Sequence, residues 1–539
     1  MGSPWLLLSS LIFLSVPFTS ATTSEHATVL VRVGAVAAET YDNFICATLD
    51  WWPPEKCDFD QCPWGLASAL NLDLNHPHLV KAIQAFNPLR IRIGGSLQDQ
   101  LVFEAPDRVC LPFKKTEGGL FGFSEGCLPR ARWDELNLLF QKTGAVVTFG
   151  LNALSGRRLI SGIRWGGPWN STNARELIKY TVSKAYSVDS WEFGNELSGR
   201  GIAARVDAEQ YAKDVVELRA MVDQLYQPPL RRPLLLAPGG FYEQEWYARF
   251  LQITGPNVVD VLTHHLYNLG AGNDPNLVDR ILDYRHLDYA GNTFRDLEQT
   301  LNKHGPWASA WISEAGGSYT SGGRLISDTF VNSLWYLDQL GLAAKYNTKV
   351  YCRQSLIGGN YGLLDVKNFK PNPDYYSAIL WHRLMERRVL DIGISGSSFL
   401  RAHAHCAKHQ AGVSLLLINL SKTTRFVVTV RNDLKVLVAE GNGIQRDDAV
   451  IRHLKRAVSW VGRRISEASP RREEYHLTAA GGNYQSKTML LNGHPLELTE
   501  TGDLPAMDPI LTPLSFPVTV SPLSVVFVIF PNLEAKACE

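Results

Sequence analysis

The 539-residue sequence has no excess of charge of either sign, since lysine plus arginine and aspartate plus glutamate both number 53. This balance does not point to nucleic acid or to a strongly polyanionic partner. Beyond the N-terminus, no apolar run reaches the ~20 residues that a transmembrane helix needs. The cysteine spacings match no zinc site, and no glycine-rich phosphate turn follows an early strand. Nothing in the sequence calls for a metal or an organic cofactor.

Residues 1–21 have the layout of a secretory signal. An apolar stretch from Trp5 to Phe18 is followed by the small residues Thr-Ser-Ala, and it is too short to span a bilayer. We therefore expect an exported protein without a transmembrane segment. It would reside outside the cell or in the wall, or else in a vacuole or lysosome. Peripheral membrane association and the oligomeric state stay open.

Export permits disulfides, and all eight cysteines lie beyond residue 21. Cys406 and Cys538 bracket the C-terminal region and are candidates for one bridge. Cys46 and Cys352 lie inside strand-like runs and are expected to be buried thiols. Two sequons, at Asn170 and Asn419, are candidate glycan sites. Four cysteines in loop-like sequence are expected to pair among themselves, with three connectivities open: Cys57, Cys62, Cys110 and Cys127.

Over about 300 residues, short apolar segments alternate with amphipathic helical stretches. Strands that are apolar on both faces and alternate with helices indicate a parallel sheet, and eight such units predict a closed (β/α)8 barrel. An open doubly wound sheet is the alternative. The eight predicted strands are residues 44–49, 89–95, 145–151, 188–196, 233–239, 258–267, 308–316 and 348–356.

Beyond about residue 378 the pattern changes to short β-strands with polar turns, which is typical of an antiparallel β-sandwich. A strand near Val29–Val33 has no partner in the barrel and is expected to join that sheet. The basic stretch near 436–474 is interpreted as an exposed loop or a short helix, with an acidic-polysaccharide site as the less favoured alternative. The predicted units are a signal peptide (1–21), an N-terminal strand (22–40), a catalytic barrel (41–377) and the sandwich (378–539).

Two of the predicted barrel strands end in a carboxylate. The run Val188–Leu197 ends on an Asn-Glu pair that contains Glu196, and Ala308–Gly317 delivers Glu314 into a glycine turn. In such a barrel the active site lies at the carboxyl ends of the strands, so both side chains are expected at one opening. Two carboxylates at one opening are the minimal equipment of a glycoside hydrolase.

The two carboxylates are assigned different roles. Glu196 is the predicted acid and then base, and Glu314 is the predicted nucleophile. If they lie ~5 to 5.5 Å apart, the reaction proceeds through a covalent intermediate with retention. Asn195 is expected to donate to a sugar 2-hydroxyl. Glu192 is discounted because it lies deep in its strand.

Several motifs, occurring in order along nearly the whole chain, resemble the heparanase and β-glucuronidase family of retaining glycoside hydrolases, and among them plant heparanase-like proteins most of all. The resemblance implies a catalytic barrel, a β-sandwich built from both chain ends, and cleavage beside a β-linked glucuronic acid. The motifs are Trp191–Leu197, Ser318-Tyr319 after Glu314, Ser327–Phe330, Arg353-Gln354 and Gly359–Tyr361.

The resemblance also implies a set of contacts to the uronate sugar, with Tyr267 in addition holding the nucleophile's carboxylate. Hydroxyl and backbone N–H donors could replace the water that a bound sugar carboxylate loses. The positions that match the family's contacts are Asp50, Ser96, Tyr267, Gln354, Gly359 and Tyr361.

The sequence departs from the animal members of that family. The stretch Val102–Arg132 is shorter than their excised basic linker and carries Cys110 and Cys127, so a single chain is expected. With a formal charge of zero, a glucuronic acid on a neutral or lightly charged plant glycan or glycoconjugate is a better substrate prediction than heparan sulfate. Alternatives are another retaining barrel glycosidase, such as a xylosidase or glucosidase, and a non-catalytic polysaccharide-binding relative.

Overall fold

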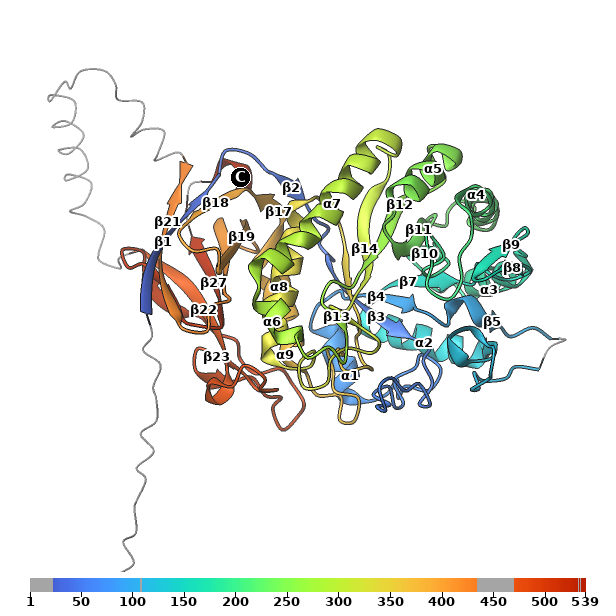
Figure 1. The fold of residues 1–539 in the computed structure, drawn as a ribbon, viewed down its shortest axis with the longest axis horizontal. Helices are drawn as coiled ribbons and strands as arrows, with labels where there is room; N and C mark the ends of the chain where they lie inside the picture. Colours follow the sequence, from blue (N-terminus) through green and yellow to red (C-terminus); the bar gives the residue numbers. More distant parts are fainter. Residues whose placement is uncertain (1–22, 107–108, 434–469, 532, 534) are drawn as a thin grey trace, which may run out of the picture.

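The computed structural model describes residues 23–106, 109–433, 470–531, 533 and 535–539. Eight strands, each parallel to its neighbours, close into a barrel in the order β10-β11-β12-β14-β16-β3-β4-β7 (Figure 1). This confirms the predicted fold class, because each predicted strand segment contains or overlaps one barrel strand. The strands are β3 (Ile45–Asp50), β4 (Arg90–Gly94), β7 (Val146–Leu151), β10 (Ser190–Phe193), β11 (Leu234–Phe241), β12 (Val261–Leu266), β14 (Ser309–Ala315) and β16 (Tyr351–Arg353).

Helices surround the barrel, and many of them coincide with the amphipathic stretches of the sequence. The long helix α7 buries one face, which includes Leu287, Phe294 and Leu301 at helical spacing. Asp283 caps its start by accepting a hydrogen bond from the backbone of Arg285. The helices are α1 (Pro77–Gln84), α2 (Arg130–Thr143), α3 (Thr172–Ser183), α4 (Ala208–Leu225), α5 (Gln244–Thr254), α6 (Leu277–Leu282), α7 (Tyr284–His304), α8 (Phe330–Lys345) and α9 (Pro373–Leu384).

Two sheets pack beside the barrel as a sandwich. In one, the N-terminal strand β1 (Thr23–Val31) pairs in parallel with β21 (Thr424–Asn432), flanked by β18 (Ile392–Ser395) and β26 (Val518–Val520). Buried residues of both sheets share one apolar cluster, which includes Val29 and Val528. The other sheet contains β2 (Ala38–Glu39), β17 (Met385–Leu390), β19 (Leu400–Ala407), β20 (Gly412–Asn419), β22 (Arg471–Ala479), β23 (Met489–Leu491), β24 (His494–Pro495), β25 (Ile510–Pro513) and β27 (Ser524–Pro531).

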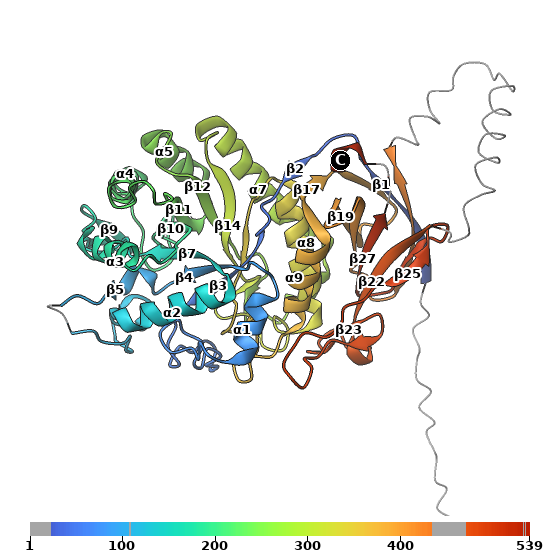
Figure 2. The same ribbon diagram turned by 180° about the vertical axis from the view of Figure 1, so that it is seen from behind.

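Helices α8 and α9 lie between the barrel strands and the sandwich in both views (Figures 1 and 2). The buried Asp338 of α8 accepts from Arg401 and pairs with His403, both on β19, at 3.0 Å each. Among the described residues, further strands form two-stranded sheets separate from the closed barrel. These pair β5 (Leu101–Phe103) with β6 (Gly126–Leu128), β8 (Arg158–Ser161) with β9 (Arg164–Gly166), and β13 (Gly270–Ala271) with β15 (Ser318–Tyr319).

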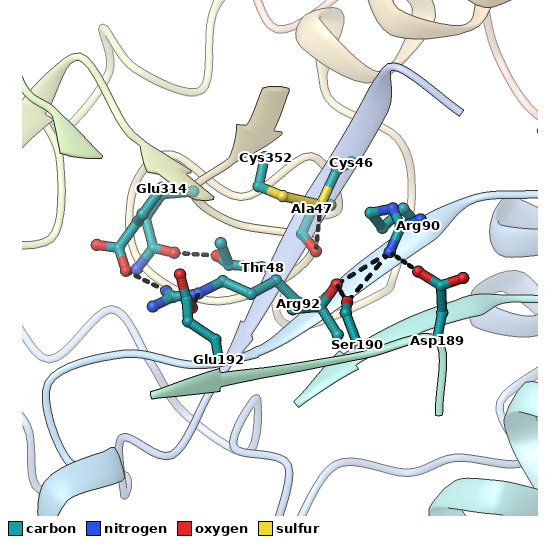
Figure 3. Close-up of a disulfide and its surroundings, with 12 residues drawn as sticks. Cys46, Ala47, Thr48, Arg90, Arg92, Asp189, Ser190, Glu192, Glu314 and Cys352 are labelled. Carbon is teal, nitrogen blue, oxygen red and sulfur yellow. Dashed lines mark hydrogen bonds and ion pairs between the residues drawn. A yellow bond between two sulfur atoms is a disulfide. The ribbon is translucent and has the colours of Figure 1, made fainter. Parts of the chain in front are cut away.

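The disulfides confirm part of the cysteine prediction and correct the rest. Cys57 pairs with Cys62 and Cys110 with Cys127, and the predicted bridge between Cys406 and Cys538 is present. The expectation that Cys46 and Cys352 are free thiols is wrong, because they form a disulfide (Figure 3). The two residues are in-register neighbours on the adjacent strands β3 and β16. Barrel closure therefore brings together side chains 306 residues apart.

The structure contradicts the candidate glycan site at Asn419. This side chain is fully buried, and its amide nitrogen donates to the carbonyl oxygens of Thr424, Val520 and Ser521. A glycan on that nitrogen would have to displace the strand-end contacts that it makes. Asn170 is exposed, and its glycosylation stays a prediction.

Two other sequence predictions extend beyond the described residues. The signal peptide lies outside them, as do residues 436–469 of the basic stretch. Residues 471–474, which were assigned to the same loop, instead begin strand β22. Within the described part of the chain, no helix is both long and apolar enough to cross a membrane.

Candidate active site

The two predicted carboxylates converge at one end of the barrel. Glu196 lies three residues beyond β10, and Glu314 is the last residue but one of β14. An oxygen of each carboxylate and a ring nitrogen of His265 all lie within 4.8 Å of one another. Both glutamates are nearly buried, at 9% and 6% exposure. Residues 118 positions apart in the sequence thus belong to one group of neighbouring polar side chains.

Glu196 is held in an unusual backbone conformation. Its φ of 56° lies in the left-handed region that residues with a Cβ rarely adopt. Its N–H donates to the carbonyl oxygen of Gly239 at 2.7 Å, which ties the turn after β10 to β11. The strand itself ends at Phe193, so a sharp turn, and not a continued strand, carries this carboxylate into the pocket.

Arg92 of β4 connects the residues of the pocket, and the sequence prediction missed it. Its guanidinium donates to Glu192 at 2.6 Å, to Glu314 at 2.7 Å and to the side-chain oxygen of Asn195 at 2.8 Å. Figure 3 shows Arg92 extending between the two glutamates. Glu192, which was discounted as a catalytic residue, is fully buried and supplies a second anion for this cation. The signal was present in the sequence, because an arginine inside the apolar strand Arg-Ile-Arg-Ile needs a buried partner.

Glu196 lies in an environment that favours its protonated form. Burial raises the pKa of Glu196 to about 7, while the charge of Arg92 opposes the shift. Its Oε1 shares a 3.0 Å hydrogen bond with Nδ1 of His265. Burial lowers the pKa of His265 to about 4, so this imidazole is neutral near pH 7. Glu196 can therefore carry a proton close to neutral pH, as a general acid must.

Glu314 has the opposite kind of environment, since a donor faces each of its oxygens. Tyr267 donates from its hydroxyl to Oε1 at 2.6 Å, and Arg92 donates to Oε2 at 2.7 Å. These contacts orient the carboxylate and compensate its negative charge. The contact from Tyr267 is the one that the family resemblance implied.

Asn195 is fixed on two sides and leaves one donor unused. Its backbone N–H donates to Asp99 at 2.8 Å, and its side-chain oxygen accepts from Arg92. Within the described residues, its buried amide nitrogen has no hydrogen-bond partner. Such a nitrogen is available to a substrate hydroxyl. Asp99 was not singled out from the sequence; burial raises its pKa to about 7.

Asp50 lies at the end of β3 and is almost fully buried, at 2% exposure. Burial, followed by the charge of Glu314, raises the pKa of Asp50 well above its ordinary value. Gly95 packs against it so closely that a Cβ there would lie 2.1 Å from Oδ1 of Asp50. Ser96, the next residue, is half-buried. A neutral Asp50 could donate a hydrogen bond to a substrate oxygen.

The remaining predicted contacts gather around Gly316. A Cβ on this glycine would lie 2.7 Å from Tyr267, 3.2 Å from Tyr361 and 3.3 Å from Gln354. The amide nitrogen of Gln354 donates to the hydroxyl of Tyr361 at 3.3 Å. Gly359 has a positive φ of 69° and backs the ring of Tyr361, which a Cβ would approach to 2.5 Å. These side chains gather beside Tyr267, which donates to Glu314.

The pocket contains residue types that bind metals, but its contacts do not favour a cation. Glu196, His265 and Glu314 offer ligand atoms within 4.8 Å of one another. Both oxygens of Glu314 already accept hydrogen bonds, one of them from a guanidinium. A divalent cation would lie against the positive charge of Arg92. The arrangement is instead suited to acid, base and nucleophilic chemistry by two carboxylates in different environments.

Comparisons with known proteins identify the family of the chain. Residues 26–341 match the model described as glycosyl hydrolase family 79, N-terminal domain. Heparanase-like protein 2 of Arabidopsis thaliana is 53% identical and covers 100% of both chains. Baicalin-beta-D-glucuronidase of Scutellaria baicalensis is 38% identical, covering 97% of this chain and 96% of its own.

Solved structures share the fold. A 4-O-alpha-L-rhamnosyl-beta-D-glucuronidase from Fusarium oxysporum 12S superposes with a TM-score of 0.64 over 93% of this chain and 100% of that one. The two sequences are 14% identical, so this likeness shows the architecture alone.

Proposed function

Because the chain belongs to glycosyl hydrolase family 79, we propose that it is an exported, retaining hydrolase of β-linked glucuronides. The observation that carries the proposal is the convergence of Glu196 and Glu314 within 4.8 Å, one in a setting that favours protonation and the other held by two donors. One oxygen of each carboxylate lies within 4.8 Å of the other, which is compatible with the ~5 to 5.5 Å between the carboxyl groups of retaining enzymes.

The first chemical step forms a covalent intermediate. An oxygen of Glu314 attacks the anomeric carbon from the face opposite the leaving group. At the same time, Glu196 gives its proton to the departing glycosidic oxygen. Arg92 and Tyr267 aim the attacking carboxylate, because they hold it by both oxygens. Asn195, with its unused amide N–H, donates to the 2-hydroxyl as positive charge develops.

The second step releases the sugar. Glu196, now ionised, takes a proton from a water that attacks the anomeric carbon and breaks the bond to Glu314. Two inversions give net retention. The neutral His265 steadies the carboxyl group of Glu196 through its hydrogen bond in both steps.

The preference for a glucuronide is supported by the relatives and by the pocket. One relative, 38% identical, is named as a β-D-glucuronidase. In this chain, the hydroxyl of Tyr361, the amide of Gln354 and a protonated Asp50 would supply uncharged donors to a sugar carboxylate. Four disulfides are typical of an oxidising compartment, which supports export together with the predicted signal.

A substrate screen tests the proposal. The purified protein should hydrolyse 4-nitrophenyl β-D-glucuronide with a kcat/KM at least about tenfold above the β-xyloside and β-glucoside, because those sugars lack the carboxylate. Proton NMR at early times should show the β-anomer of glucuronic acid as the first product. A preference for xyloside or glucoside would favour another retaining glycosidase. Firm glycan binding without any turnover would favour a non-catalytic role.

The pH dependence should show one limb near neutrality. Glu196 acts as an acid only while protonated, and burial raises its pKa to about 7. For phenyl β-D-glucuronide, log kcat/KM should therefore fall with a slope of about −1 above pH ~7, because kcat/KM reports the free enzyme. The measurement is a series of initial rates from pH 4 to 9. Rates that stay constant from pH 7 to 9 would contradict the assignment of Glu196 as the acid.

A further inference from the structure

One aromatic side chain at the opening of the barrel is not used by the proposed mechanism. Phe241 is the last residue of β11 and is 37% exposed, while the six residues before it are buried. The strand neighbour in register with it is His265 of β12, whose ring faces the pocket and contacts Glu196. In-register neighbours on parallel strands share a face of the sheet, so Phe241 lies on the pocket side.

The ring of Phe241 contacts the partners of both carboxylates. Its centroid lies 6.3 Å from that of His265, at an interplanar angle of 75°, and 6.3 Å from that of Tyr267, at 53°. His265 bonds to Glu196, and Tyr267 bonds to Glu314. An apolar ring with more than a third of its surface exposed therefore lies against the two residues that bond to the carboxylates.

The barrel order shows which part of a substrate this ring would meet. In the closed sequence of eight strands, β11 is four places from β3 and so lies opposite Asp50, a predicted sugar contact. The turn of Glu196 packs against β11 instead, since a Cβ on Gly240 would lie 2.5 Å from Oγ of Ser198 and 3.2 Å from Cα of Glu196. The leaving group must lie beside its proton donor. Phe241 therefore lies on the side of the opening where Glu196 donates its proton, across the barrel from Asp50.

One exposed cation near Phe241 faces a carboxylate. Arg200, on the turn after Glu196, is 95% exposed, but its guanidinium lies 3.6 Å from Glu243, two residues after Phe241. A sulfated or otherwise anionic leaving group would need uncompensated cations here. An apolar ring surface gains most from a flat, apolar partner through edge-to-face or offset contacts.

Resting on the function proposed above, we infer that Phe241 forms a leaving-group subsite for planar aromatic aglycones. Phe241 selects the aglycone, whereas the residues across the barrel select the uronate.

Kinetics with two leaving groups test the inference. For the wild type, Phe241→Ala, Phe241→Tyr and Tyr289→Ala, kcat/KM is measured with 4-methylumbelliferyl and methyl β-D-glucuronides. Tyr289, an aromatic residue of α7 that is 70% exposed, is the matched control. The aryl-to-methyl ratio should fall about fivefold in Phe241→Ala and stay within twofold of wild type in the other variants, since one aromatic contact has roughly that effect. An unchanged ratio in Phe241→Ala would overturn the inference.

A third substrate separates an aromatic site from a sugar site. If the kcat/KM of a glucuronyl-galactose disaccharide falls in Phe241→Ala as far as that of the aryl glucuronide, the ring supports a sugar and the aromatic assignment is wrong.

A binding measurement keeps the subsite testable if turnover is absent. The affinity of free 4-methylumbelliferone, followed by isothermal titration calorimetry, should weaken about fivefold in Phe241→Ala and not in Tyr289→Ala. Such binding without turnover of any glucuronide would refute the proposed function and leave the subsite standing. Turnover with equal binding by wild type and Phe241→Ala would refute the subsite and leave the proposed function standing.

Discussion

Glu314→Gln is expected to lower kcat for aryl glucuronides by on the order of 10⁴-fold, because both the nucleophile and its negative charge are removed. The shape of the side chain is kept. The amide oxygen of the glutamine can still accept from Arg92, and its NH₂ group can donate to the hydroxyl of Tyr267, which now acts as acceptor. Loss of activity would therefore reflect chemistry and not a collapsed pocket. Initial rates and a thermal unfolding curve measure the two effects separately.

The control for this variant is another carboxylate. Glu209 of α4 is exposed and pairs with Arg249 at the surface, so Glu209→Gln should leave kcat within about twofold of wild type. In the smaller variant Glu314→Ala, added azide can take the place of the missing carboxylate. It would attack from the face opposite the leaving group and give the α-glucuronyl azide, which NMR identifies. A fully active Glu314→Gln would refute the assignment of this residue as nucleophile.

Glu196→Gln is expected to lower kcat/KM for phenyl β-D-glucuronide by about 10²- to 10⁴-fold, which is the usual contribution of a general acid. The loss should be smaller for the 4-nitrophenyl glucuronide, because 4-nitrophenolate departs with little help from a proton. The fall in rate above pH ~7 should also disappear, since the group that titrates there, with a pKa of about 7, is gone. Rate measurements with both substrates across the pH range check all three expectations.

Azide also distinguishes the two roles. In Glu196→Ala the covalent intermediate still forms on Glu314, and azide attacks it without needing a base. The product is then the β-glucuronyl azide, opposite in configuration to the product of Glu314→Ala. Azide products with these configurations exchanged between the two variants would mean that the roles are reversed.

The sequence identified those active-site residues that belong to a recognisable local pattern. Glu196 and Glu314 each follow an apolar strand and precede a glycine or Leu-Ser-Gly turn, so a pair of strand-end carboxylates could be predicted. Arg92 could have been suspected from its apolar strand, but not its partners, since they come from β10, the turn after it and β14. His265 is one of two adjacent histidines with no local feature that separates them. Only the contact to Glu196 does so.

The disulfides also divide into those that the sequence could predict and one that only the fold revealed. The pairs Cys57–Cys62 and Cys110–Cys127 are close in sequence, and their grouping was predictable. The disulfide between Cys46 and Cys352 was not, because each lies in an apolar strand where a buried thiol is equally acceptable. Their pairing depends on the first and last barrel strands meeting, which no local pattern records.

By itself, the sequence determined the kinds of elements and their order, because hydrophobic periodicity and turn residues act over a few neighbouring positions. Eight strand and helix units, a following set of short strands and two strand-end carboxylates were all visible at that range. The tertiary structure alone decided how the side chains are placed: Arg92 contacts two glutamates, His265 contacts Glu196, and Phe241 lies across the barrel from Asp50. The reason is that closing the barrel brings together strands that lie up to about 300 residues apart, and contacts across that distance arise from the register of the closed sheet.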